Sequence, residues 1–278
     1  MKTIDRSPVA DRRCERAKSA RCVTTSTWPV TCEDFRAGTG YRFGTHTHEQ
    51  PHVCFIIEGT LVERDGRRRR RMPAGAGRLS PAGDTHELAV GDGRPLRCLV
   101  LSIAPDGFDE SDETLRDGRR YVAGPGVSDL ARRLLAELRL LDDVSPIALE
   151  MLATEAAALG AGSPGSRVGP TPPWLEHVRD RVRDDLRLVP TLADLARDAG
   201  VSRAHLARTF RMRYGYTIGS FVRGQRLETA RRLILHTELP LATVAYQAGF
   251  ADQSHMTRLV RSRFGIPPGR LRDRRHSA

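Results

Sequence analysis

The sequence predicts two domains: an N-terminal antiparallel β domain followed by two helices, and a C-terminal domain made only of helices. A length of 278 residues suits two domains of ordinary size. Short apolar runs separated by glycine, proline and Asp-Gly turns fill residues 40–103, which is typical of antiparallel strands. The last hundred residues instead carry helical spacing and an internal repeat. Between the two regions lies a segment rich in glycine and proline, residues 160–173, which we interpret as a linker.

The composition limits the class of protein. Hydrophobic residues make up 39% of the chain and charged residues 28%, as in globular proteins. No apolar run approaches the roughly 20 residues of a membrane-spanning helix, and residues 1–20 lack the apolar centre of a signal peptide. We therefore expect a cytoplasmic protein with no membrane role. The five cysteines (Cys14, Cys22, Cys32, Cys54 and Cys98) are odd in number and lack CxxC spacing, so reduced thiols are expected.

The positive charge is concentrated in the helical region. Residues 174–278 hold 20 arginines against 10 acidic residues, which accounts for +10 of the net charge of +11. Arginines that contact phosphates release counterions and give affinity for any nucleic acid sequence. The asymmetry favours a nucleic-acid-binding domain, with a solvated basic surface as the alternative.

The β region carries two local signals. Asp65-Gly66 predicts a hairpin turn, and the five arginines at 67–71 that follow favour an exposed edge strand over a nucleic-acid patch. Leucine and alanine at helical spacing then predict helices over residues 129–141 and 147–159, with Pro146 near the start of the second. These two helices are candidates for an antiparallel pair and for a dimer contact.

The helical region contains one unit twice. Residues 192–201, LADLARDAGV, recur 49 residues later as LATVAYQAGF, and residues 205–215 recur 50 residues later at 255–265. Two copies are too few for a solenoid, so we interpret them as a duplicated small module.

Each copy has the pattern of a helix-turn-helix unit. In the first copy Thr191 and Asp194 form a capping box, and Gly200 ends the first helix before the turn. In the second copy Gly249 makes the turn and Asp252 caps the next helix. The second helix of each copy is expected to expose a set of mostly basic and polar residues: Arg203, Ala204, Ala207, Arg208 and Arg211 in the first copy, and Gln253, Ser254, His255, Arg258 and Arg261 in the second.

The two exposed helices suit double-stranded DNA. The major groove admits a helix, and arginine and glutamine pair bidentately with guanine and adenine. A long helical pattern over residues 218–235 joins the copies and would fix their spacing. Two such helices on one face of the duplex must enter successive major grooves, about 34 Å apart.

These residues carry a family resemblance over about residues 174–272. The first copy reads Leu-Ala-x-x-Ala-Gly-Val-Ser-x-x-His-Leu-x-Arg-x-Phe, the second reads Gly-Phe-x-Asp-Gln-Ser-His-Met-x-Arg, and Gly265-Ile-Pro-Pro-Gly follows. The region resembles the DNA-binding domain of AraC-type transcription regulators. The resemblance implies that the exposed residues of both second helices read bases, with Arg211 and Arg261 as candidate phosphate contacts. Ala204 and Ala207 stand where family members often have larger side chains, so we expect the first helix to read few bases.

A histidine pattern lies in the β region. His46, His48 and His52 have one parity, so an extended strand would point them to one face, although Pro51 interrupts the run. The spacings Gly40-x5-His46-x-His48-x3-His52-x6-Gly59 and Gly75-x5-Pro81-x-Gly83-x2-His86 resemble the two motifs of metal-binding cupin β-barrels.

The cupin resemblance implies a β-barrel with a metal site. His52 stands where the family usually has glutamate, which leaves four imidazoles as candidate ligands: His46, His48, His52 and His86. Imidazole suits zinc, iron, nickel and copper, so a divalent transition metal is one candidate occupant. In AraC-type regulators the barrel usually senses a small molecule, so an organic effector hydrogen-bonded by these histidines is the other.

Together these features predict a sequence-specific DNA-binding transcription regulator, an activator, modulated by a small molecule or metal. Its expected partners are double-stranded DNA, the effector, a second copy in a homodimer, and RNA polymerase if it activates. The alternative is a metal-dependent cupin dioxygenase or isomerase with an accessory DNA-binding domain. No paired carboxylates, nucleophile with base, or phosphate loop supports turnover. The expected divisions are an N-terminal segment (1–34), a cupin-like barrel (35–105), a helical, possible dimerisation region (106–160), the linker (161–173) and the double helix-turn-helix domain (174–274).

Overall fold

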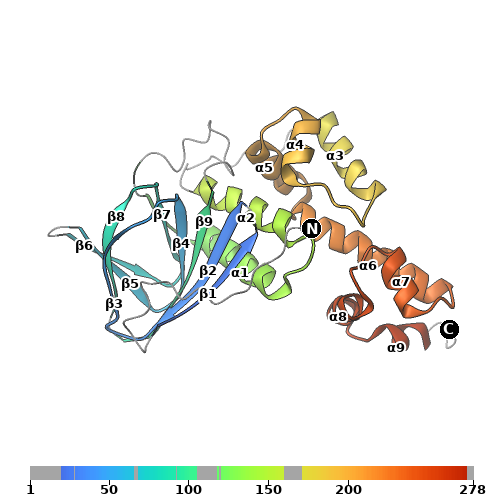
Figure 1. Cartoon of the computed structure of the whole chain (residues 1–278), viewed down its shortest axis with the longest axis horizontal. Coiled ribbons are helices and arrows are strands. Elements are labelled where there is room, and N and C mark those ends of the chain that lie inside the picture. Colours follow the sequence, from blue (N-terminus) through green and yellow to red (C-terminus); the bar gives the residue numbers. More distant parts are fainter. Residues whose placement is uncertain are drawn as a thin grey trace. The chain divides into compact units, whose positions relative to one another are not determined.

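A computed structural model describes residues 20–27, 29–65, 68–91, 93–104, 118, 120–159 and 171–273 (Figure 1). The chain divides into two compact units, one formed mainly by residues up to 168 and the other mainly by residues from 169. Most of the expected linker, the first 19 residues and Arg274 lie outside the described residues. None of the helices in the described ranges has the length and apolar character needed to cross a bilayer.

The first unit contains two antiparallel sheets, which confirms the predicted all-antiparallel β architecture. The strands form two facing layers and not one continuous closed ring, over the part of the chain that the structure describes. The six-stranded sheet has the order β1-β2-β9-β4-β7-β10, with β1 (Ala20–Thr27), β2 (Val30–Ala37), β4 (His52–Glu58), β7 (Ala76–Ser80), β9 (Leu96–Ile103) and β10 (Arg120–Ala123). The four-stranded sheet has the order β3-β8-β5-β6, with β3 (Arg42–Thr47), β5 (Thr60–Asp65), β6 (Arg68–Pro73) and β8 (Thr85–Val90).

The range 35–105 expected for the β domain is too short. Strands β1 and most of β2 precede it, and β10 follows it, yet all three belong to the six-stranded sheet. β2 pairs with β9 along its whole length, from Val30 opposite Ile103 to Ala37 opposite Leu96. Its sequence, VTCEDFRA, interleaves buried apolar residues with charged ones, and so many polar residues conceal a half-buried strand in a scan for apolar runs.

Residues 68–71 of the arginine run lie in an edge strand, as the sequence predicted. β6 is the edge strand of the four-stranded sheet, and Arg69, Arg70 and Arg71 are exposed. Charged side chains on an edge strand discourage pairing with another sheet. Gly66 and Arg67, in the expected hairpin turn, lie outside the described residues.

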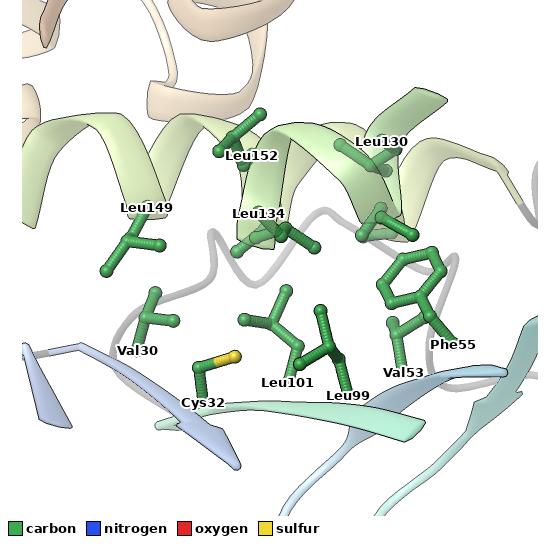
Figure 2. Close-up of a cluster of buried hydrophobic side chains, with 14 of the residues drawn as sticks. Val30, Cys32, Val53, Phe55, Leu99, Leu101, Leu130, Leu134, Leu149 and Leu152 are labelled. Carbon is green, nitrogen blue, oxygen red and sulfur yellow. The ribbon is translucent and has the colours of Figure 1, made fainter. Parts of the chain in front are cut away.

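Two helices cover the outer face of the six-stranded sheet, and both confirm the predicted helical spans. They are α1 (Pro125–Leu140) and α2 (Ser145–Leu159). Because their apolar faces pack on the sheet, these faces are covered within the chain and are not free for a dimer contact. Figure 2 shows the packed side chains, with Leu130, Leu134, Leu149 and Leu152 of the helices above Val30, Cys32, Val53, Phe55, Leu99 and Leu101 of the strands.

The second unit contains the predicted tandem helix-turn-helix arrangement. Thr191 and Asp194 form a capping box, Gly200 ends the first helix with φ +65°, and the Asp252 carboxylate accepts a hydrogen bond from the His255 backbone N–H. One unit is α4–α5, the other is α7–α8, and α6 joins them. The helices are α3 (Pro173–Asp184), α4 (Leu192–Ala199), α5 (Arg203–Tyr214), α6 (Ile218–His236), α7 (Leu241–Gln247), α8 (Gln253–Phe264) and α9 (Pro268–Asp273).

The buried side chain of Arg226 connects α6 to the segment before α4 and lies next to the turn before α8. Arg226 has no exposed surface, and its Nε and Nη2 donate to the carbonyl oxygen of Leu186 at 2.8 and 2.6 Å. The turn at Gly249 approaches the same carbonyl, because a Cβ added there would lie 2.8 Å from it. The segment before α4 and the turn before α8 therefore meet at one point on the connecting helix.

We predict that Gly59→Ala destabilises the β domain much more than Gly83→Ala. Both glycines have φ +77°, a conformation that costs a residue with a side chain about 1 kcal/mol. A Cβ at Gly59 would lie only 2.4 Å from the carbonyl oxygen of Pro95, whereas nothing lies within 4 Å at Gly83. The overlap should add roughly 1–3 kcal/mol. Urea unfolding of both variants measures the difference, and equal losses would contradict the close approach.

Candidate metal centre and nucleic-acid interface

The two sheets line a cavity of about 650 Å³ that is partly open to solvent. One part of its wall is aromatic, where Phe35, Tyr41 and Phe43 lie with ring centroids 5.0 to 6.1 Å apart. The Phe43 ring continues this wall to His46, at 6.1 Å. The lining combines this aromatic wall with many polar side chains, and a cavity of this volume is large enough for a small molecule.

Three of the four candidate metal ligands converge in this cavity. The pairing of β3 with β8 places His46 directly opposite His86. One ring nitrogen from each of His46, His48 and His86 lies within 4.8 Å of the other two. His52 comes from the opposite sheet and is not in this group, although its ring centroid is 4.0 Å from that of His48. The expected four-histidine set is therefore a set of three, with His52 beside it.

Hydrogen bonds orient two of these three rings. His46 Nδ1 lies 2.7 Å from the Gly44 carbonyl oxygen, and His86 Nδ1 lies 3.2 Å from Asp84 Oδ2. Because an oxygen acceptor holds the proton on Nδ1, the lone pair of each ring is on Nε2. His86 Nε2 is buried and has no hydrogen-bond partner. Metal-binding histidines typically have this arrangement, in which the second nitrogen donates to a carbonyl or carboxylate.

The surroundings keep the buried histidines neutral. Burial, and then the positive charge of Arg78, lower the pKa of His86 to about 3. Burial is also the main reason that the pKa of His52 falls to about 2. Neutral imidazole is the form that binds a metal ion. The residues present therefore fit a divalent transition metal held by three histidines with further coordination positions open.

A buried ion-pair network supports the cavity. Arg78 is 1% exposed, and its Nη2 donates to Glu63 Oε1 at 2.9 Å and to Asp84 Oδ2 at 2.6 Å. Asp84 also bonds His86, and the Tyr121 hydroxyl donates to the other oxygen of Glu63. One guanidinium thus links the histidine cluster to β10, the strand just before α1.

This network was not predicted from the sequence. Its one local signal was an arginine inside the apolar strand β7, between the motif residues Gly75 and Pro81. The carboxylate partners are 15 and 6 residues away, on separate elements, so no spacing rule connects them.

Of the ten residues expected to contact DNA, five are exposed on the second helices of the two helix-turn-helix units. On α8, Gln253, Ser254, Arg258 and Arg261 are exposed. On α5, Arg208 is exposed, whereas Arg203, Ala204 and Arg211 are half-buried.

Two of the expected outward positions have little exposed surface. Ala207 is 3% exposed and His255 is 6% exposed. Ala207 lies three residues before Phe210, so it shares the side of α5 that carries Phe210. The His255 ring packs edge-on against Phe250, with centroids 5.4 Å apart. A role of these two residues in contacting DNA stays a prediction.

Comparison with known proteins matches both regions. The family described as "AraC-like ligand binding domain" matches residues 33–157, and a "Helix-turn-helix domain" family matches residues 195–274. The chain is similar to the HTH-type transcriptional regulator GlxA of Rhizobium meliloti, with 34% identity over 57% of this chain and 50% of that protein. It is also similar to the transcriptional activator NphR of Rhodococcus sp, with 44% identity over 30% of this chain and 24% of that protein. The matches thus span half or less of these relatives.

Among solved structures, the chain is similar to unsaturated fatty acid bound ToxT from Vibrio cholerae, with 14% identity. That likeness covers 87% of this chain and 94% of that one, at a TM-score of 0.36. At a TM-score this low, the likeness gives no support for the family of this chain.

We predict that Arg78→Met lowers the free energy of unfolding by about 3–5 kcal/mol, because it leaves the buried Glu63 and Asp84 carboxylates without a counter-charge. Arg97→Met is the control. Arg97 is 14% exposed and pairs with Asp34, which is 23% exposed, so solvent screens the pair and its loss should cost about 1 kcal/mol or less. Denaturant unfolding at pH 7 measures the free energy of unfolding of both variants. Equal losses would show that the buried Arg78 network contributes no more to stability than the Arg97–Asp34 pair.

Proposed function

We propose, from the premise that the chain belongs to the AraC family of transcription regulators, that it binds DNA sequence-specifically and regulates transcription in response to an occupant of its cavity. The observation that carries the proposal is the tandem of helix-turn-helix units on one connecting helix. A single helix-turn-helix pattern is common, but two joined rigidly suit two successive major grooves of one duplex.

The two candidate reading helices, α5 and α8, make unequal contributions to base recognition. On α8, Gln253 and Arg258 can make bidentate contacts to adenine and guanine, and Ser254 adds a short polar contact. On α5, Arg203 and Arg208 are the base-reading candidates, and Ala204 offers at most contact with a thymine methyl group. Arg211 and Arg261 lie further along their helices and suit phosphate contacts. We therefore propose that α8 provides most of the sequence preference.

The cavity is the proposed sensor site. His46, His48 and His86 would hold a divalent transition metal, and a bound metal would supply a Lewis-acidic contact for an oxygen or nitrogen atom of an effector. The aromatic wall leaves room for an organic effector beside or instead of the metal. An occupant that moves His86 also disturbs the Asp84–Arg78–Glu63 network, which ends at Tyr121 on β10.

We propose regulation rather than turnover in this cavity. Asp84 hydrogen-bonds His86, and Glu63 is connected to it through Arg78. Both carboxylates are bound by Arg78, so neither is available as a general base. The relatives GlxA and NphR are named as regulators. Activation through RNA polymerase, assembly as a homodimer and a cytoplasmic location belong to the same proposal.

We predict that Gln253→Ala and Arg258→Ala each reduce discrimination between a selected duplex and random DNA by about 1–3 kcal/mol. The matched control is Arg263→Ala, because Arg263 is exposed near the other end of α8 and can contact only phosphates. It should weaken binding to both DNAs alike. Fluorescence anisotropy at fixed salt concentration measures all affinities. Equal binding of the unmodified protein to selected and random DNA would overturn the proposal.

We predict that protein purified without chelator carries close to one equivalent of a transition metal, and that His46→Ala and His86→Ala each lose it. His52→Ala should keep most of the metal, because His52 is outside the group of three converging nitrogens. Elemental mass spectrometry gives the metal content. Metal-free protein after supplementation with zinc, iron, nickel or copper would leave an organic molecule as the sole occupant of the sensor site.

A further inference from the structure

We propose that Cys54 and Cys98 form a dithiol site in the cavity wall that binds a neutral trivalent metalloid hydroxide, the chemical class of arsenous acid. The site is separate from the histidine cluster. It does not depend on the proposed regulatory function, because it is a statement about two sulfur atoms and the cavity beside them.

The pairing of β4 with β9 brings the two thiols together. Cys54 lies opposite Val100, and Ile56 lies opposite Cys98, so the cysteines are diagonal neighbours on adjacent strands. Side chains two positions apart on a strand share a face, which puts both sulfurs on the same side of the sheet. Both residues line the cavity and belong to its apolar cluster, with exposures of 5% and 4%.

The two thiols are close enough to influence each other. Their mutual interaction lowers the pKa of Cys54 and raises the pKa of Cys98. The register of β4 and β9 places the second sulfur where it can bond a centre that the first sulfur already holds.

The geometry and charge favour a bridging atom of this class. Diagonal neighbours on antiparallel strands have Cα atoms about 7–8 Å apart, beyond the roughly 4.4–6.8 Å that a disulfide spans. An atom bonded to both sulfurs closes that gap without moving the strands. Because Cys54 and Cys98 lie in an apolar cluster, a neutral hydroxide enters beside them without the desolvation cost of a bare cation.

The reaction needs no oxidant. Each thiol replaces one hydroxide on the trivalent centre, so two metalloid–sulfur bonds form and two metalloid–oxygen bonds break. The two thiol protons leave with the hydroxides as two water molecules, and the oxidation state of the centre does not change. Cys22 also lines the cavity, but Phe35 on β2 lies between it and Cys98 in the register, so the third position keeps a hydroxide.

Phenylarsine oxide tests the site, because it bonds two adjacent thiols with loss of one water. The full chain is used with Cys14→Ser throughout, since Cys14 lies outside the described residues. Intact-mass spectrometry under native conditions should show one phenylarsine adduct, removed by excess dithiol and stable to monothiol. Cys54→Ser and Cys98→Ser should each lose it. Cys32→Ser should keep it, because Cys32 is buried on the opposite face of the sheet, against the helices, and does not line the cavity.

A second measurement does not depend on folding of the variants. The Cys14→Ser protein, with and without phenylarsine oxide, is unfolded and alkylated, and its peptides are mapped. Protection of Cys54 and Cys98 together supports the site. No adduct, or protection of any other pair, overturns it. Neither readout involves DNA, so the outcome is independent of whether the protein is a regulator.

Discussion

The spacing of the two candidate reading helices depends on one helix, α6, and on the buried arginine that anchors it. A buried guanidinium is unfavourable unless its donors are satisfied, and Arg226 satisfies two of them on the single carbonyl of Leu186. The close turn at Gly249 meets the same atom. Ala230 and Ile234 of α6 then pack into the core that contains Met256 of α8. Phe210 of α5 also lies against Phe221 of α6, with ring centroids 6.2 Å apart. Both candidate reading helices therefore contact α6, which makes reading of two grooves by one chain physically reasonable.

A second buried arginine organises the cavity of the β domain. Arg78 lies between the carboxylates of Glu63 and Asp84, so the network carries one more negative than positive charge, and Asp84 also orients the ring of His86. The resulting site is partly aromatic and is lined by imidazoles and thiols. Such a site accepts ligands that coordinate through lone pairs or form bonds to sulfur.

The helical domain was largely predictable because its signals are local. The capping box at Thr191 and Asp194, the cap at Asp252 and the glycine at 200 each act within one turn of chain, and all were predicted. The positions of Ala207 and His255 were not, because periodicity assigns residues at the border of an apolar face poorly.

The β domain depends on pairings that a sequence does not display. Parity placed His46 and His48 correctly, but Pro51 separates them from His52, which begins a strand of the other sheet. The pairing that sets His86 opposite His46 spans 40 residues, and Glu63 reaches Arg78 from a separate strand. Charged residues within β2 likewise concealed a strand that pairs along its full length. The residue types of the candidate site were therefore easier to predict from the sequence than the strand pairings that bring them together.

The most direct test of the account is the effect of spacing on DNA affinity. The affinity for a selected duplex is compared with the affinity for a duplex in which five extra base pairs, about half a helical turn, are inserted between the contacts of α5 and those of α8. If α6 fixes the two helices to one face of the duplex, α5 and α8 cannot both contact their bases after the insertion, so the affinity should fall toward that for random DNA by the share that the α5 contacts supply. Unchanged affinity would show that the two helices do not read DNA together, and would contradict the central claim.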